Sequence, residues 1–226
     1  MDSSVVNKTI RAEIWPFLKS VGFALTTART AWRHKPDRVD VINFQSFNSY
    51  NAGVLGITTF SFAVNLGCYL RYIPDRYAES SDASTLREAE PRPQEYQCQM
   101  RRRLIRSYPD RRSKDKQIWY IDEKGSNVSQ ALHDVRMLLL RDAYPWFERF
   151  ASPSEVYDIL AFAEEDMGQL WGFGRPGSPI RCYYLGYTAL AARKVEEARV
   201  NLLKAAATKS FEGLADQLRR DADSAS

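Results

Sequence analysis

The chain has little histidine, the residue that most metal sites and many proton-transfer sites use. Its 226 residues include 2 histidines, His34 and His133, which lie far apart and belong to no H-x-x-x-H or histidine–cysteine cluster. A zinc-type site would therefore lack its usual ligands. The sequence predicts no metal, no cofactor and no catalytic residue.

Cysteine is also scarce. The 3 cysteines, Cys68, Cys98 and Cys182, form no C-x-x-C pair, which is typical of reduced thiols in the cytoplasm. Cys68 and Cys98 fall in strand-like segments, where a buried thiol acts as a small apolar side chain. No G-x-S-x-G sequence marks a nucleophilic serine.

Long hydrophobic runs are missing. Polar residues interrupt every apolar segment well before the roughly 18 residues that a membrane helix needs. The N-terminus has no basic region followed by an apolar run, so no signal peptide is evident. We expect a cytoplasmic protein with no membrane partner.

The composition indicates a globular protein with a modest, unevenly distributed positive charge. Hydrophobic residues make up 44% and charged residues 27% of the chain, which suits a packed core. The net charge of +4 is too small to identify a nucleic-acid binder. The segment from Arg101 to Lys116, however, holds eight Lys or Arg residues and two Asp residues.

Hydrophobic periodicity predicts the secondary structure. Apolar residues at helical spacing from Val6 to Val21 predict a helix over about 4–21, and the alternation from Thr58 to Leu70 predicts a strand with one buried face. The expected strands are 23–33, 38–47, 58–70, 96–107 and 117–122, and the expected loops are 48–53 and 75–93. A long helix is expected over 128–147, and a second helix is expected to start at the Ser152-Pro-Ser-Glu155 capping box. Two or three further helices are expected after about residue 180, including a helical hairpin over 184–203.

These elements indicate an α+β fold. We expect an antiparallel sheet of four or five strands with an N-terminal helix and a long packing helix, followed by a C-terminal helical segment. The expected division is an α+β sheet domain over 1–150 and a helical segment over 151–226 that packs on it as one structural unit.

The sequence CQMRRRLIRS (98–107) carries three consecutive arginines. Strand alternation places Arg101 and Arg103 on one side and Arg102 on the other with Met100 and Leu104. We interpret Arg102 as structural. Arg101 and Arg103 are candidate partner contacts if the face is open, and structural salt bridges if it is covered. The same polar face is expected to carry Asn43, Gln45, Ser61 and Asn65.

The segment Gly172-Phe-Gly174-Arg-Pro-Gly177 matches G-x-G-x-x-G. That pattern binds dinucleotides when a strand leads into it, but here a helical segment precedes it and Pro176 removes an amide donor. We interpret the segment as a loop between helices. Arg175 within it is a further candidate partner contact.

Several short sequences, taken in order, resemble a bacterial family defined as domain of unknown function 4304. The resemblance covers about residues 10–150 and implies an α+β domain without assigning an activity. The similar sequences are Leu18-Lys-x-x-Gly22-Phe23, Val41-Ile-Asn-Phe-Gln45, Phe62-Ala-Val-Asn-Leu-Gly67, Cys98-Gln-Met-Arg101-Arg-Arg103-Leu104 and Trp119-Tyr120.

Three hypotheses for function remain. The first is a non-catalytic cytosolic module that binds another protein, such as a bacterial immunity or accessory protein. The second is nucleic-acid binding through the Arg101–Lys116 patch, with Tyr108, Trp119 and Tyr120 available to stack on bases. The third is an enzyme that acts through Arg101, Asn65 and a carboxylate.

Overall fold

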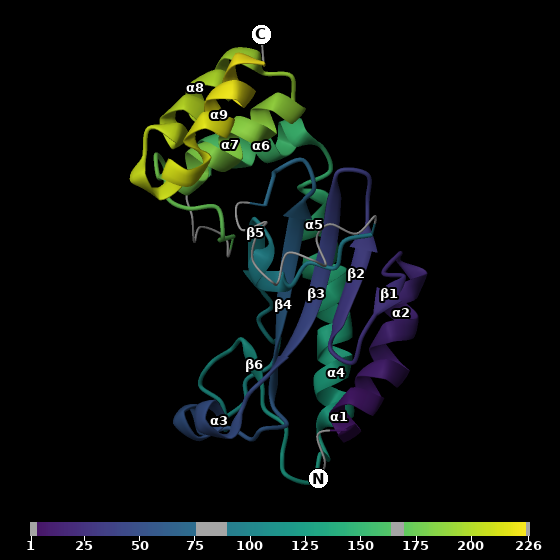
Figure 1. The fold of residues 1–226 in the computed structure, drawn as a ribbon. Helices are drawn as coiled ribbons and strands as arrows, with labels where there is room; N and C mark the ends of the chain where they lie inside the picture. The colour runs from purple at the N-terminus through teal and green to yellow at the C-terminus, as the bar shows by residue number, and fades with distance from the viewer. Residues whose placement is uncertain (1–3, 76–89, 164–169, 225–226) are drawn as a thin grey trace. The chain divides into compact units, whose positions relative to one another are not determined.

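The computed structural model describes residues 4–75, 90–163 and 170–224, and its backbone forms two compact units (Figure 1). Of the predicted loop 75–93, residues 76–89 lie outside the described residues. Each unit combines three stretches of the chain. Unit 1 comprises Met1–His34, Asp40–Gly67 and Arg102–Phe147, and unit 2 comprises Lys35–Val39, Cys68–Arg101 and Glu148–Ser226.

The fold is α+β with an antiparallel sheet, as the sequence predicts. The described residues form six strands of this sheet, β1 (Leu25–Thr26), β2 (Thr30–His34), β3 (Arg38–Ser46), β4 (Phe62–Leu70), β5 (Met100–Arg103) and β6 (Ile118–Trp119). Their order is β1-β2-β3-β4-β5, and β6 also pairs with β4.

Strand β4 differs from the prediction in two ways. It begins at Phe62 rather than Thr58, and all of its nine residues are buried. The expectation of one buried and one open face was therefore wrong for this strand. Its polar residue Asn65 tolerates burial because its amide is hydrogen-bonded to neighbouring side chains.

The predicted loop 48–53 is also wrong, because it contains most of helix α3 (Ser49–Leu55). The Asn48 side chain accepts a hydrogen bond from the Asn51 backbone at 2.8 Å and caps the first turn. Gly56 ends the helix with a φ of 66°, a left-handed conformation that glycine adopts without strain. These two caps define a helix that has no hydrophobic periodicity.

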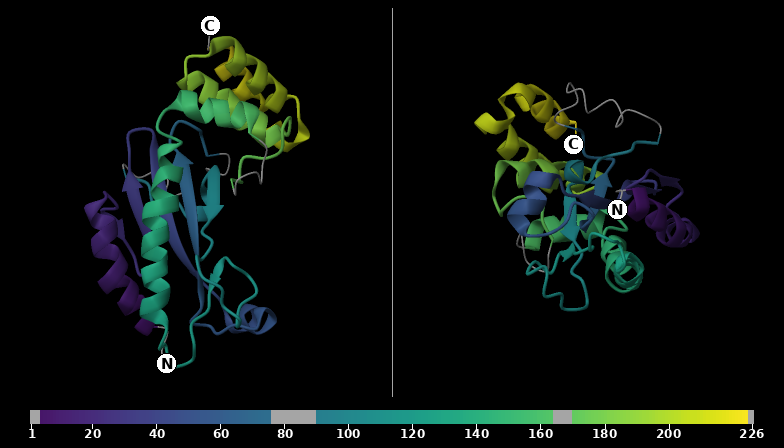
Figure 2. Two further views of the ribbon diagram at one scale, coloured as in Figure 1. Left: turned by 180° about the vertical axis from the view of Figure 1, so that it is seen from behind. Right: turned by 90° about the horizontal axis from the view of Figure 1, so that it is seen from below.

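The long helices of unit 1 confirm the helical periodicity. The run α1 (Ser4–Thr9), η1 (Ile10–Ile14) and α2 (Trp15–Ser20) occupies the predicted 4–21 helix. The run α4 (Val128–Leu138), η4 (Leu139–Ala143) and α5 (Tyr144–Glu148) occupies 128–147. Both η segments are π-helical. Figure 2 shows α4 lying across one face of the sheet.

The core of unit 1 contains a continuous series of aromatic rings. The centroid distances are 5.6 Å from Trp15 to Phe44, 5.6 Å from Phe44 to Phe62 and 5.8 Å from Phe62 to Trp119. The rings of Phe62 and Trp119 are stacked, which matches the β4–β6 register that places these two residues opposite each other. The series links the N-terminal helices, the sheet and β6.

A buried ion pair lies in the same core. Arg33 Nη2 lies 2.7 Å from Asp40 Oδ2, and both side chains are at most 2% exposed. The Arg33 guanidinium also lies over the rings of Phe23 and Tyr144, at 5.2 Å and 4.8 Å from their centroids. The charge of Arg33 is thus compensated by one carboxylate and by aromatic faces.

Unit 2 contains the C-terminal helices, which confirm the predicted capping box and hairpin. Ser152 and Glu155 cap each other's backbone at the start of α6 (Pro153–Phe162). Helices α7 (Pro179–Ala191) and α8 (Val195–Ala206) form the hairpin. Gly186 allows their close approach, because an added Cβ would lie 2.6 Å from Leu202. The other described elements of unit 2 are η6 (Lys209–Leu214), α9 (Ala215–Asp223) and, earlier in the chain, η3 (Glu95–Gln97).

We expect Asp40→Ala to lower the free energy of unfolding by about 3–5 kcal/mol, because it leaves the Arg33 charge buried without its carboxylate. The double variant Arg33→Met/Asp40→Leu removes both charges and should cost less than the single change. Urea unfolding followed by circular dichroism measures both effects. A double variant less stable than Asp40→Ala would contradict the assignment.

Candidate partner-binding surface

The structure places Arg103 in a network of amide side chains within unit 1. Its Nε donates to Asn65 Oδ1 at 2.7 Å and its Nη2 donates to Gln45 Oε1 at 2.9 Å. Asn65 Nδ2 also donates to Gln45 Oε1, at 3.0 Å. The network joins side chains from β3, β4 and β5. Because both partners are neutral amides, they orient the guanidinium without cancelling its charge.

The other predicted polar-face residues of unit 1 contact their own neighbours. Asn43 donates to the Thr30 hydroxyl at 3.0 Å. Ser61 is fully buried, and its hydroxyl accepts a hydrogen bond from the Ile121 backbone at 3.1 Å. Ser61 and Asn65 therefore stabilise the sheet from inside. Asn43, Gln45 and Arg103 are half-buried and retain accessible surface.

Arg101, in unit 2, has a different environment from Arg103. Its Nε donates to Glu95 Oε1 at 2.7 Å and its Nη2 donates to Glu95 Oε2 at 3.2 Å, which is a bidentate pair. The Arg101 and Trp171 backbones form an antiparallel bridge. The two arginines that the sequence places on one side of the strand thus differ, because Arg101 pairs with a carboxylate and Arg103 with amides.

The glycine-rich segment that follows Trp171 is a loop, as the sequence predicts. Gly172 has a φ of 103°, and an added Cβ would lie 2.8 Å from the Gln99 carbonyl oxygen, so a larger residue would disturb the bridge. Buried Arg181 donates to the Gly174 carbonyl at 3.3 Å and to the Leu160 carbonyl at 2.6 Å. Arg175 is exposed.

Arg102 lies on the opposite side of β5 from Arg103, as expected. Its Nη1 donates to the Asp142 carbonyl at 3.5 Å. The pKa of the Asp142 carboxyl is lowered, mainly by a hydrogen bond from Arg141 and also by the charges of Arg141 and Arg102. The contacts of Arg102 are therefore made within the protein, which agrees with a structural role.

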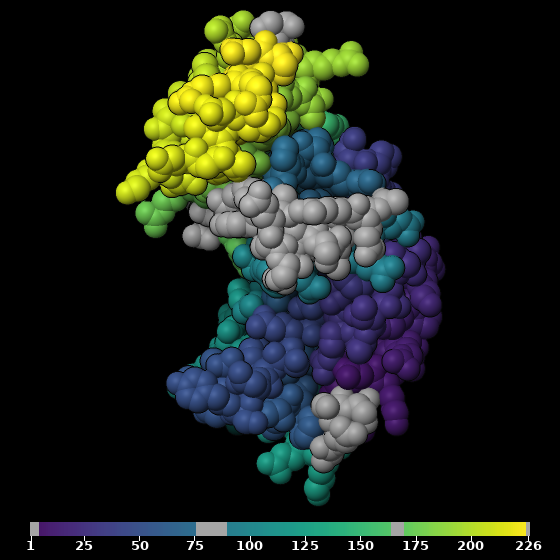
Figure 3. Space-filling view, viewed as in Figure 1, coloured from purple at the N-terminus to yellow at the C-terminus, as the bar shows by residue number. Residues whose placement is uncertain are grey.

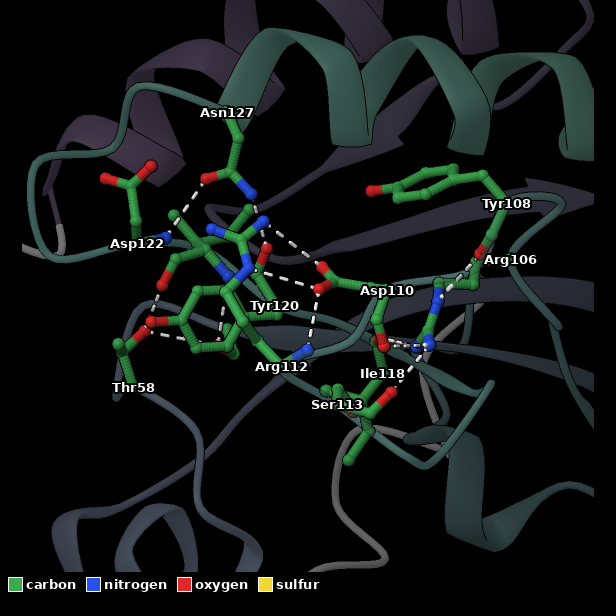
Figure 4. Close-up of polar contacts among 12 residues, drawn as sticks. Thr58, Arg106, Tyr108, Asp110, Arg112, Ser113, Ile118, Tyr120, Asp122 and Asn127 are labelled. Atoms are coloured by element: carbon green, nitrogen blue, oxygen red, sulfur yellow. Dashed lines mark hydrogen bonds and ion pairs between the residues drawn. The ribbon is translucent and has the colours of Figure 1, made fainter.

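Arg106 organises the connection between β5 and β6, which we call the basic loop (residues 107–117). The side chain is buried and donates to five backbone carbonyls around this loop (Figure 4). The accepting carbonyls are those of Tyr108 (3.0 Å), Asp110 (3.4 Å), Ser113 (2.7 Å), Asp115 (2.5 Å) and Ile118 (2.6 Å). A guanidinium has five N–H donors, so the loop uses this capacity fully.

The basic loop presents cations at its surface. Arg111, Lys114 and Lys116 are exposed. Arg112 lies 4.5 Å above the Tyr120 ring and pairs with Asp110 at 3.1 Å. Burial would raise the pKa of Asp110, but hydrogen bonds from the Arg112 backbone and side chain outweigh burial and lower it. The basic loop carries four cations against two carboxylates, so its net charge is positive.

Stacking on a base requires an exposed ring face, and two of the three aromatic residues near this patch have buried or covered rings. Trp119 is 0% exposed, and its Nε1 donates to the buried Asp134 carboxylate at 3.0 Å. One face of Tyr120 is covered by Arg112. Tyr108 is half-buried. The expectation that Trp119 could stack on a base was wrong.

Among the described residues of unit 1, the two large apolar side chains with the highest exposure lie on helix α3, a helix that the sequence reasoning missed. Tyr50 is 78%, Val54 is 70% and Leu55 is 45% exposed, while Ala52 is the buried residue of the helix. Figure 3 shows α3 protruding at the lower left of the view. The signal that could have revealed it is the absence of any charged residue from Val41 to Leu70, combined with the Asn48 and Gly56 caps.

Within the described ranges, no group of three or more His, Cys, Asp or Glu side chains is positioned to hold a metal ion. The described cysteines Cys68, Cys98 and Cys182 are all buried. None of the helices in this part of the chain is long and apolar enough to cross a membrane.

We expect Arg106→Ala to loosen the basic loop, because five backbone carbonyls lose their donor. The free energy of unfolding should fall by about 3 kcal/mol, a typical cost when a buried network loses a charged partner. Amide hydrogen exchange across residues 107–117 should accelerate. The control Arg111→Ala removes an exposed arginine and should change neither measurement. Unchanged exchange in Arg106→Ala would contradict the role of this side chain.

Comparison with known proteins agrees with the resemblance seen in the sequence. The family model described as Domain of unknown function (DUF4304) matches residues 14–149, which is more than half of the chain and includes all of the unit 1 surface described above. No curated protein and no solved structure matches the chain. The chain therefore belongs to the family of domain of unknown function 4304.

Proposed function

We propose that this protein is a non-catalytic, cytosolic module that binds another protein, and that α3 is the centre of the contact surface. The observation that carries the proposal is the exposure of Tyr50, Val54 and Leu55 on a short helix. Burying large apolar side chains is the main favourable term in protein association. An exposed tyrosine in a region without charged residues is also typical of protein interfaces.

Two further features support this proposal. Capping at both ends holds α3 in place, so binding would cost little conformational entropy. The three cysteines occur as buried thiols, which suits a reducing cytosol. A bacterial immunity or accessory role would fit such a module, and identification of the partner would decide between these roles.

We expect Tyr50→Ser/Val54→Ser to lose most of the partner captured by the tagged wild-type protein from the source organism. Both side chains are exposed, so the melting temperature should stay nearly unchanged. The matched control is Phe162→Ser in unit 2, which removes another apolar side chain that is 81% exposed and should retain capture. Quantitative mass spectrometry compares the three samples. Equal capture by all of them would reject α3 as the contact surface.

Nucleic-acid binding is a second candidate, favoured by the exposed Arg111, Lys114 and Lys116. Phosphate contacts would make affinity fall steeply with salt. Because the basic loop also contains Asp110 and Asp115 and Trp119 is buried, we expect no binding of single- or double-stranded oligonucleotides at about 50 mM salt. Fluorescence anisotropy measures this. Saturable, salt-sensitive binding that Lys114→Glu abolishes would instead support this second function.

A further inference from the structure

We infer that the partner is an acidic protein, and that α3 and the basic loop form one composite surface that recognises an apolar groove bordered by carboxylates. This inference rests on the proposed protein-binding function and specifies its partner. Tyr50, Val54 and Leu55 would fill the groove. Arg111, Lys114 and Lys116 would face the carboxylates at its rim.

The two parts of this surface meet at the start of β4. Helix α3 precedes β4, and Thr58, three residues beyond Leu55, donates its hydroxyl proton to the Ile121 carbonyl at 2.5 Å. Tyr120, the neighbour of Ile121, carries the Arg112 guanidinium on its ring. A short chain of contacts therefore connects the apolar helix to the basic loop. Figures 1 and 2 show both segments on the same side of unit 1.

The composite surface is preorganised. The Asn48 and Gly56 caps fix α3, and the Arg106 side chain fixes the basic loop through five carbonyls. Rigid surfaces lose little entropy on binding. A surface with both an apolar centre and a polar rim already in place matches the usual anatomy of a specific interface.

The charges of the surface select an acidic partner. The basic loop contains four cations and two carboxylates, and α3 contains no charge. Arg112 already pairs with Asp110. Among the residues that the structure describes, the side chains of Arg111, Lys114 and Lys116 make no hydrogen bond or ion pair with protein atoms, so they are available to an external carboxylate.

The same charges disfavour two other occupants. A second copy docked through α3 about a two-fold axis would bring two basic loops close together, and like charges repel. An anionic membrane would meet the exposed Asp115 and Glu123, which oppose the attraction of the cations. A protein groove can place its carboxylates against individual cations and avoid these acids.

The partner would first be identified by a photo-crosslinking benzophenone amino acid in place of Tyr50 of the full chain, expressed in the source organism. The crosslinked protein is identified by mass spectrometry and produced in pure form. Calorimetric titration of that protein with the wild-type chain then gives the dissociation constant. Between about 50 and 300 mM salt the dissociation constant should rise roughly tenfold, because exposed charge pairs are screened.

Charge-reversal variants separate the contribution of the basic loop to binding from the contribution of α3. Arg111→Glu/Lys114→Glu should weaken binding at low salt about tenfold or more. Arg11→Glu/Lys19→Glu changes the net charge equally at exposed positions of the N-terminal helix and should leave the dissociation constant within about twofold. Replacing a rim carboxylate of the partner by lysine should restore binding of the loop variant.

The outcomes distinguish this inference from the proposed function. If Tyr50→Ser/Val54→Ser abolishes binding while salt and loop charge reversal have no effect, protein binding by α3 stands and the acidic partner is wrong. If neither set of variants weakens binding, both proposals fail. Sedimentation of the chain with phosphatidylserine vesicles, or a dimer in sedimentation equilibrium that Tyr50→Ser/Val54→Ser dissociates, would also overturn the acidic-partner inference.

Discussion

A buried guanidinium is stabilised by acceptors for its N–H groups, and backbone carbonyls serve as these acceptors for buried arginines in both units of the protein. Arg106 donates hydrogen bonds to five backbone carbonyls and thereby holds the connection between β5 and β6 together. In unit 2, buried Arg38 donates to the Phe150 carbonyl at 2.7 Å, and Arg181 gathers carbonyls from two separate segments. Irregular backbone that would otherwise need water is thus satisfied from within.

Because several arginines are paired inside the protein, the number of positive residues in the sequence overstates the positive charge available at the surface. The Arg101–Lys116 segment looks like one basic patch, but Arg101 pairs with Glu95, Arg103 with two amides and Arg106 with backbone. The charge that remains at the surface comes from the tip of the basic loop. A mildly basic protein can therefore present a small, well-defined cationic rim without being basic over a broad surface.

The sequence predicts the parts of the fold that repeat regularly. Helices 4–21 and 128–147 and the α7–α8 hairpin have long apolar periodicities, and they are present. Helix α3 has a single buried residue, so periodicity could not reveal it, although Asn48 and Gly56 mark its ends. The α+β class follows from the number and order of such segments.

The candidate surface was less predictable because its contacts join distant positions. Alternation places Arg103 on the correct side of β5, but its partner Gln45 lies on β3, and strand order is needed to bring them together. The carbonyl acceptors of Arg106 depend on a loop conformation that no local pattern encodes. The burial of Trp119 was not predicted, because it depends on contacts with Phe62 and Asp134, which lie on other elements of the fold.

The connection around Arg106 has a consequence for the edge of the sheet. One side of β4 is paired with two short strands, β5 and β6, and the basic loop separates them. A long straight edge strand is a template on which other chains add as β-strands and aggregate. Here that template is divided into pieces too short to extend, with lysine and arginine between them. By ordering the basic loop, Arg106 therefore also helps to prevent strands of other molecules from adding to this edge of the sheet.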